Sequence, residues 1–375
     1  MKPFEQPIHV TRPLLPDLEL VTAKLQEVWA AQWLTNNGPQ HRQFEERLLG
    51  VLKSPYLSLF NNGTIALIVA CQSLRLSGEV ITTPFTFAAT PHVLTWNGIR
   101  PVFCDIDPVT MNIDAARIES MITPQTTAIL GVHVFGTPCE VTAIQEIADR
   151  YGLRVIYDAA HAFGVELDGR GIGTFGDISM FSFHATKLFH SGEGGALTFN
   201  DPNLKARIDL LKNFGIKNED VVMMPGINGK MNELQAALGL VVLDCIEEER
   251  AKRHALQQTY LGGLGGLPGI TPCIREIPGG RNSYQYFVIR IDAETFGASR
   301  DQVYQELRRY NVLARKYFYP LCSDYACYSH LPSADPKGLP VARRVADEVL
   351  ALPFYGGLDR DDAERICAII KSCGR

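Results

Sequence analysis

Lys187 is the residue of this chain best suited to covalent chemistry. It follows a nearly continuous apolar run at residues 178–183 and has Phe181, Phe183 and Phe189 as neighbours in the sequence. Burial among these rings and a nearby cation would lower the pKa of the lysine, and a neutral amine is the nucleophile that forms Schiff bases. The plainer interpretation is a surface lysine at the end of a strand.

Asp158 ends the preceding apolar run, at residues 153–157. A buried carboxylate is costly unless it meets a positive partner, and a pyridinium nitrogen is one such partner. Alternatively, Asp158 caps the N-terminus of a helix, a position for which aspartate is well suited. Because Asp158 and Lys187 lie on consecutive predicted strands, both side chains can point into one pocket.

The segment Asn61-Asn62-Gly63-Thr64 stands at the start of a predicted helix at residues 64–74. Exposed backbone N–H groups, the helix dipole and the Thr64 hydroxyl suit a phosphate, and Gly63 permits a close approach of the backbone. An ordinary Asn-Gly turn with Thr64 as the cap would show the same residues. Together, a lysine, an aspartate and a phosphate cradle match a pyridoxal-phosphate (PLP) site.

Strand-like and helix-like segments alternate along the chain, which predicts an α/β fold with a mainly parallel sheet. Ligands of such sheets bind at the carboxyl ends of the strands. We expect an N-terminal arm (residues 1–15), a large domain (16–245) and a small C-terminal α+β domain (246–375). A long helix is predicted at 233–253, and the glycine-rich residues 262–266 predict a hinge.

Composition excludes several classes of protein. With 375 residues, 46% of them hydrophobic, the chain is too apolar to be disordered, and a net charge of −5 argues against nucleic-acid partners. We expect neither a membrane span nor a signal segment. The nine cysteines are never paired as Cys-x-x-Cys, which is typical of reduced thiols in a cytoplasmic protein, and no metal site is expected.

Motifs along nearly the whole chain occur in the order of the DegT/StrS family of PLP-dependent sugar aminotransferases, which the sequence resembles. They are Trp33-Leu-Thr-Asn-Asn-Gly-Pro39, Asn62-Gly-Thr-Ile-Ala-Leu67, Thr82-Thr-Pro-Phe-Thr-Phe87-Ala-Ala-Thr90, Pro101-Val-Phe-Cys-Asp-Ile-Asp-Pro108, Asp158-Ala-Ala-His161, Ser182-Phe-His-Ala-Thr-Lys187, Gly192-Glu-Gly-Gly195, Gly226-Ile-Asn-Gly-Lys-Met231 and Gln235-Ala-Ala-Leu-Gly239. The resemblance implies fold type I of the PLP-dependent transferases: a large domain with a mainly parallel seven-stranded sheet between helices, and a smaller C-terminal domain.

The resemblance also implies residue roles. Lys187 would bind the cofactor as a Schiff base and move the substrate proton, while Asp158 would keep the pyridine nitrogen protonated. The other implied cofactor contacts are the ring-stacking Phe87, Ala160 on the opposite ring face, His161 near the phenolic oxygen, the phosphate ligands Gly63, Thr64 and Ser182, and Asn228 from a neighbouring subunit. The last of these implies a homodimer with shared active sites.

The implied reaction is transamination from L-glutamate, which leaves as 2-oxoglutarate, to a nucleotide-linked keto-deoxysugar. Within the family the chain is most similar to members that aminate dTDP-4-keto-6-deoxy-D-glucose at carbon 4, giving dTDP-4-amino-4,6-dideoxy-D-glucose. Amination at carbon 3 stays open, as does an inactive regulatory relative. Dehydratases of the family carry histidine where Lys187 stands, which disfavours dehydration. Candidate substrate contacts are Trp33, Thr35, Glu193, Lys230, Arg315 and Tyr319.

Overall fold

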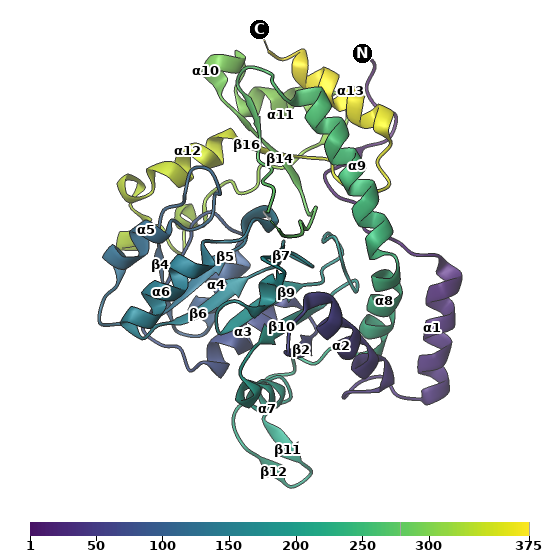
Figure 1. Cartoon of the computed structure of the whole chain (residues 1–375), viewed down its shortest axis with the longest axis vertical. Coiled ribbons are helices and arrows are strands. Elements are labelled where there is room, and N and C mark those ends of the chain that lie inside the picture. Colours follow the sequence, from purple (N-terminus) through teal and green to yellow (C-terminus); the bar gives the residue numbers. More distant parts are fainter. Residues whose placement is uncertain (278, 375) are drawn as a thin grey trace.

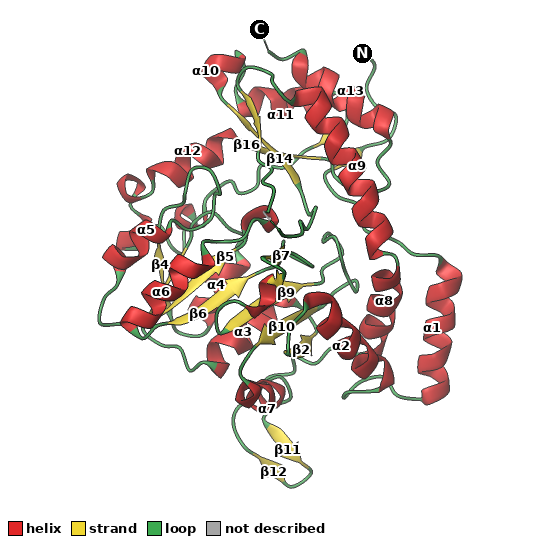
Figure 2. Ribbon diagram, viewed as in Figure 1, coloured by secondary structure: helices red, strands yellow, loops and turns green. Residues whose placement is uncertain are grey.

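The computed structural model describes residues 1–277 and 279–374 and is built around one seven-stranded sheet (Figures 1 and 2). The strands in order across the sheet are β2 (Tyr56–Phe60), β10 (Gly195–Phe199), β9 (Ile178–Ser182), β6 (Arg154–Asp158), β5 (Thr126–Val132), β3 (Glu79–Thr82) and β4 (Arg100–Phe103). Only β10 runs antiparallel to its two neighbours. The predicted α/β class and mainly parallel sheet are confirmed, although β10 itself was not among the predicted strands.

Helices cover both faces of this sheet. They are α2 (Pro39–Leu52), α3 (Gly63–Ser73), α4 (Ala89–Trp96), α5 (Ala115–Ile118), α6 (Val141–Tyr151), α7 (Pro202–Leu211) and α8 (Glu233–Asp244). Helix α1 (Leu18–Ala31) packs farther out, against α8. Two short hairpins, β7 (Glu166–Leu167) with β8 (Arg170–Gly171) and β11 (Ile216–Asn218) with β12 (Val221–Val222), lie outside the sheet. The second hairpin projects beyond α7 (Figure 1).

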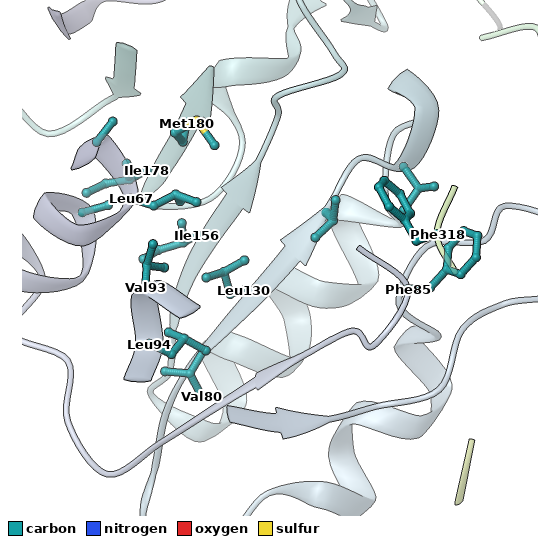
Figure 3. Packing of buried hydrophobic residues seen from close by; sticks show 14 of the residues in the cluster. Leu67, Val80, Phe85, Val93, Leu94, Leu130, Ile156, Ile178, Met180 and Phe318 are labelled. Atoms are coloured by element: carbon teal, nitrogen blue, oxygen red, sulfur yellow. The ribbon is translucent and has the colours of Figure 1, made fainter. Parts of the chain in front are cut away.

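Alternate residues of the central strands belong to two different cores, because successive side chains of a strand point to opposite faces. Leu130 and Ile156 pack with Leu67 of α3 and Val93 of α4 (Figure 3). Their sequence neighbours, among them Ile129, lie in a separate cluster with residues of α5 and α6. The sheet is therefore buried on both faces, which explains why its strands are continuous apolar runs in the sequence.

A second group of elements forms its own core in the C-terminal part of the chain. It comprises α9 (Ile246–Leu264), β13 (Ile270–Pro272), β14 (Phe287–Ile291), α10 (Ala293–Phe296), α11 (Arg300–Arg309), β15 (Val312–Leu313), β16 (Val349–Leu352) and α13 (Arg360–Lys371). The buried side chains of α12 (Pro340–Glu348) belong instead to the cluster that contains Leu130 and Ile156. Strand β1 (Ile8–His9) of the N-terminal arm pairs with β15, and Phe4 and Ile8 are buried in this core. Both chain termini accordingly lie beside α13 (Figure 1).

Two expectations for the segment that joins the two cores were wrong. The single helix predicted at 233–253 is two helices, α8 and α9, separated at Cys245. The predicted glycine hinge is the end of a helix, since α9 continues through Gly262 and Gly263. A Cβ atom on Gly263 would lie 2.6 Å from Sγ of Cys367 in α13, so this glycine allows two helices to pack closely.

Candidate active site

A cavity of about 610 Å³ opens where β6 and β9 end and α3 begins. It therefore lies at the carboxyl edge of the sheet, as the topology predicts. Nine of the residues singled out in the sequence line this cavity together: Gly63, Thr64, Phe87, Asp158, Ala160, His161, Ser182, Lys187 and Glu193. Residues from four distant segments, 63–64, 87, 158–161 and 182–193, are thus brought to one place.

Lys187 lies in the loop after β9 and its side chain is half-buried in the cavity wall. Burial lowers the pKa of its amine from 10.5 to about 8, while the negative charge of Asp158 acts in the opposite direction. At pH 8 about half of such amines are neutral, against about 0.3% for an ordinary lysine. Lys187 is therefore available as a nucleophile near neutral pH, and it is not a plain surface lysine.

Asp158 ends β6 and is buried, and no helix begins after it, so the helix-cap interpretation is wrong. Its Oδ1 accepts the N–H of Ala160 at 3.0 Å, and its Oδ2 accepts the Thr90 hydroxyl at 2.8 Å. Burial raises the pKa of this carboxyl, whereas both hydrogen bonds and Lys187 lower it. A cationic ligand group in the cavity would offset the cost of burying this charge.

Thr90 is itself hydrogen-bonded to Thr86, whose Oγ1 lies 2.8 Å from the Thr90 Oγ1. A hydroxyl has one proton, and Thr90 uses it for the ionised Asp158, so Thr86 must donate to Thr90. Thr86 also lines the cavity. A chain of two hydroxyls therefore runs from the cavity wall to the buried carboxylate.

Helix α3 presents its N-terminus to the cavity. Asn62, not Thr64, caps the helix, because the Asn62 Oδ1 accepts the N–H of Ile65 at 2.8 Å. The backbone is closely packed here: a Cβ on Gly63 would lie 3.2 Å from Cβ of Ser182. The Thr64 and Ser182 hydroxyls line the same cavity, and this arrangement suits a phosphate group.

His161 forms part of an aromatic wall. Its ring stacks on Phe318 with centroids 5.9 Å apart and meets Tyr286 edge-on at 5.0 Å. Burial holds the pKa of His161 well below its usual value, so the ring is neutral. Its Nδ1 accepts the N–H of Phe135 at 3.3 Å, which places the proton on Nε2 and makes that nitrogen a donor.

Sequence reasoning missed several residues of the cavity. Tyr286, Tyr317 and Phe318 come from the C-terminal part of the chain, and they pack against the core of the large sheet. The last two lie inside the segment 315–320, which the sequence singled out through its neighbours Arg315 and Tyr319. Thr86 lies one residue before Phe87, in a motif that was recognised for its aromatic residue.

Two of the predicted residues stand at the mouth of the cavity. Phe87 is 63% exposed, and Glu193 is exposed with its Oε1 3.7 Å from Nε2 of His184. Both exposed side chains therefore border the opening of the cavity to solvent.

The remaining predicted residues do not line this cavity in the single chain. Lys230 Nζ donates to Oδ1 of Asn213 at 2.8 Å and to Oδ1 of Asn228 at 2.9 Å, and Lys230 borders a second cavity of about 470 Å³ between α2 and α7. Four further predicted residues have exposed side chains outside the cavity: Trp33, Thr35, Arg315 and Tyr319.

The described part of the chain comprises residues 1–277 and 279–374. No three His, Cys, Asp or Glu side chains in this part of the chain come together as a metal site. None of its helices is long and apolar enough to cross a bilayer.

Comparison with known proteins agrees with this geometry. The model of the DegT/DnrJ/EryC1/StrS aminotransferase family matches residues 18–371. The chain is 48% identical over 372 residues to a dTDP-4-amino-4,6-dideoxy-D-glucose transaminase of Escherichia coli, with 98% of both chains covered. It is 45% identical to the protein of the same name from Shigella dysenteriae, with 98% of this chain and 99% of that protein covered.

Among solved structures, DesI in the presence of its TDP-sugar product superposes with a TM-score of 0.94. The two are 39% identical, and the match covers 100% of this chain and 94% of that one. The resemblance seen in the sequence motifs is thereby confirmed, and the chain belongs to the DegT/DnrJ/EryC1/StrS aminotransferase family.

Proposed function

We propose that this protein is a PLP-dependent transaminase that transfers the amino group of L-glutamate to dTDP-4-keto-6-deoxy-D-glucose, giving dTDP-4-amino-4,6-dideoxy-D-glucose. One observation carries the chemistry: Lys187, Asp158 and the N-terminus of α3 line a single cavity. The two transaminases that are 48% and 45% identical over nearly the whole chain support the sugar substrate.

The groups of the cavity fit PLP. The buried Asp158 carboxylate has two neutral hydrogen-bond donors, and Lys187 is the cation among the described residues that lowers its pKa, so a pyridinium nitrogen would add positive charge beside it. A Cβ on Gly195 would lie 2.8 Å from N of Gly63, so the strand and the helix end are packed as tightly as backbone allows beside the phosphate cradle. When bound, PLP would act as an electron sink for charge that develops on the substrate carbon.

Each residue has a defined task in this proposal. Lys187 would bind the cofactor covalently and afterwards move a proton, because burial lowers the pKa of its amine to about 8. Asp158 would hold the proton of the pyridine nitrogen. Neutral His161 would offer the Nε2 proton to the phenolic oxygen, and Gly63 with Thr64 would hold the phosphate. Ser182 would be a further phosphate contact, and Phe87 and Ala160 would contact the ring.

The acceptor sugar would lie against the aromatic wall. Tyr286, Tyr317 and Phe318 provide apolar faces and two hydroxyls, which suit a deoxyhexose. The diphosphate needs cations or backbone N–H groups. We assign that task to Lys230 and Arg315, with Trp33, Thr35, Glu193 and Tyr319 as further substrate contacts.

A second copy of the chain is part of the proposal, because Asn228 and Lys230 lie outside the cavity of their own chain. Large apolar side chains are exposed around α1, on the β11–β12 segment and on α8: Leu18, Leu20, Trp29, Trp33, Leu34, Phe214, Ile216, Val222, Met223 and Leu234. Such extensive apolar exposure is typical of an interface between subunits. We propose a homodimer in which Asn228 of one copy contacts the cofactor phosphate in the other.

The test of the reaction is incubation with L-glutamate, PLP and a panel of dTDP- and UDP-linked keto-sugars. We expect 2-oxoglutarate and an amine at carbon 4 of the dTDP-sugar, assigned by NMR, and no product with Lys187→Ala. An amine at carbon 3 would refute the assigned substrate. A protein that remains colourless with PLP and is not fixed to it by borohydride would refute the cofactor.

The shared site is tested by subunit mixing. Lys187→Ala and Asn228→Ala proteins are each expected to be nearly inactive, and a mixed dimer should regain one intact site. Mixtures no more active than either parent would contradict the shared site.

A further inference from the structure

Gln285 lies in the C-terminal part of the chain, two residues before β14, yet it contacts the loop that carries Lys187. Its side chain is 2% exposed. The Gln285 Oε1 accepts the N–H of Leu188 at 2.7 Å, and the Gln285 Nε2 donates to the carbonyl of Thr186 at 3.2 Å. Because one neighbour is a donor and the other an acceptor, the orientation of the amide is determined by its partners.

These two hydrogen bonds hold the peptide groups on either side of Lys187. The Thr186 carbonyl belongs to the peptide that precedes the Lys187 Cα, and the Leu188 N–H belongs to the peptide that follows it. Since peptide groups are planar, fixing both of them fixes φ and ψ of Lys187. The Lys187 N–H also donates to the His184 carbonyl at 2.9 Å, so this glutamine and the loop itself together set the direction in which the lysine side chain leaves the backbone.

The backbone around Gln285 is held in an unusual conformation. Tyr284 has φ of 53°, in the left-handed region that a bulky residue rarely adopts. The Arg253 Nη1 donates to the carbonyls of Tyr284 and Gln285, at 3.3 and 3.4 Å. Such conformations persist only where the surroundings hold them in place.

Arg253 is anchored in turn. It is fully buried, and its Nε donates to Oε1 of Glu249 one helical turn earlier in α9, at 2.6 Å. The same oxygen accepts the N–H of Gly356 at 2.9 Å. A buried ion pair of the C-terminal core therefore fixes the segment from which Gln285 reaches the lysine loop.

We propose that Gln285 is a positioning residue that orients the Lys187 side chain toward its reaction partners and couples this orientation to the C-terminal core. The proposal rests on the proposed role of Lys187 as the group that binds the cofactor and moves the proton. Gln285 contacts the lysine loop through the backbone groups of Thr186 and Leu188, so we expect it to affect the rate of proton transfer and the protonation behaviour of the lysine more than substrate affinity.

The main test variant is Gln285→Met, which keeps the length of the side chain and removes both hydrogen bonds. The matched control is Gln257→Met in α9, which changes another buried glutamine that is 8% exposed. Both are compared with the wild-type holoenzyme by thermal unfolding, by kcat and KM for the keto-sugar, and by the pH midpoint of the visible absorbance of bound PLP.

For Gln285→Met we expect kcat to fall by about 10- to 100-fold, which is the scale of effect of a small misplacement of a reacting group. KM should change less than about threefold, the absorbance midpoint should move, and borohydride should fix PLP more slowly. Gln285→Glu keeps an acceptor for the Leu188 N–H and should lose less kcat than Gln285→Met, which gives an independent test if the methionine variant folds poorly.

Wild-type kcat and an unmoved midpoint in a folded Gln285→Met protein would overturn the proposal. Equal losses in Gln285→Met and Gln257→Met, or in Gln285→Met and Gln285→Glu, would overturn it as well. A wild-type protein that is not fixed to PLP at Lys187 would instead refute the proposed function, so the two failures are distinguishable.

Discussion

Replacing Thr90 by valine removes one hydroxyl from the chain that leads to Asp158 and keeps the branched shape of the side chain. In the structure that hydroxyl donates to Oδ2 of Asp158 at 2.8 Å, and Ala160 N–H is the other donor to the carboxylate. Thr90→Val therefore leaves a buried carboxylate with half of its donors. Because Thr90 lowers the pKa of Asp158, we expect that pKa to rise in the variant.

The magnitude follows from the charge of the acceptor. A hydrogen bond to an ionised group is worth about 1.5–3 kcal/mol, and we take about 2 kcal/mol because the second donor remains. If PLP binding depends on ionised Asp158, this loss weakens the affinity for PLP by about 30-fold at pH 7. The deficit should grow as the pH falls, since the carboxyl of the variant takes up its proton at a higher pH than that of the wild type.

The assay is titration of apoprotein with PLP at several pH values between 6 and 8, followed by absorbance. Thr90→Ser keeps the hydroxyl and should bind PLP within about threefold of the wild type. Thermal unfolding of each apoprotein shows whether the variants fold. Wild-type affinity in Thr90→Val, or an equal loss in Thr90→Ser, would refute the argument that the hydroxyl keeps Asp158 ionised.

Three further perturbations have expected outcomes. Lys187→Met should make the apoprotein more resistant to urea at pH 7, because the folded-state pKa of Lys187 is lowered to about 8. The charged amine lowers the free energy of unfolding by its full amount below pH 8, and this loss disappears towards pH 10.5. A gain in stability that does not depend on pH would contradict the shift. Gly195→Ala places a Cβ 2.8 Å from the Asn62 carbonyl carbon, so PLP affinity in the same titration should fall at least about 10-fold, and an unchanged affinity would contradict the close packing at the phosphate cradle. Glu233→Gln weakens the two acceptor contacts to the N–H groups that open α2, at 2.7 and 2.9 Å, and should lower the free energy of unfolding by about 1–3 kcal/mol in urea titrations; no change would show that the carboxylate is not needed there.

Much of the large sheet was predictable because its strands are buried on both faces. Residues 178–183 and 153–157 are continuous apolar runs, and the structure has strands there. Strand β10 was missed because it begins at Gly195, directly after Gly194, and glycines in isolation indicate a turn. The break at Cys245 was missed because both adjoining helices have good helical sequences.

A site residue was predictable where its own type and its neighbours in the sequence indicate its chemistry. Lys187 and Asp158 were identified in this way, as each polar side chain follows an apolar run. Gln285 and Thr90 were not, because their importance lies in contacts to residues 97 and 68 positions away. The residues next to a glutamine or a threonine in the sequence do not indicate such a distant partner, and only the folded structure shows it.

The pairing of β1 with β15 joins two segments that are synthesised far apart in time. Phe4 and Ile8 leave the ribosome long before α13, which is part of the core that buries them. These two side chains must therefore remain in water until α13 has been made. A fragment that begins at residue 246 would present an apolar groove and an unpaired strand where the arm belongs, and such edges promote aggregation. The first ten residues are thus as much a part of the C-terminal core as the helices that follow residue 246.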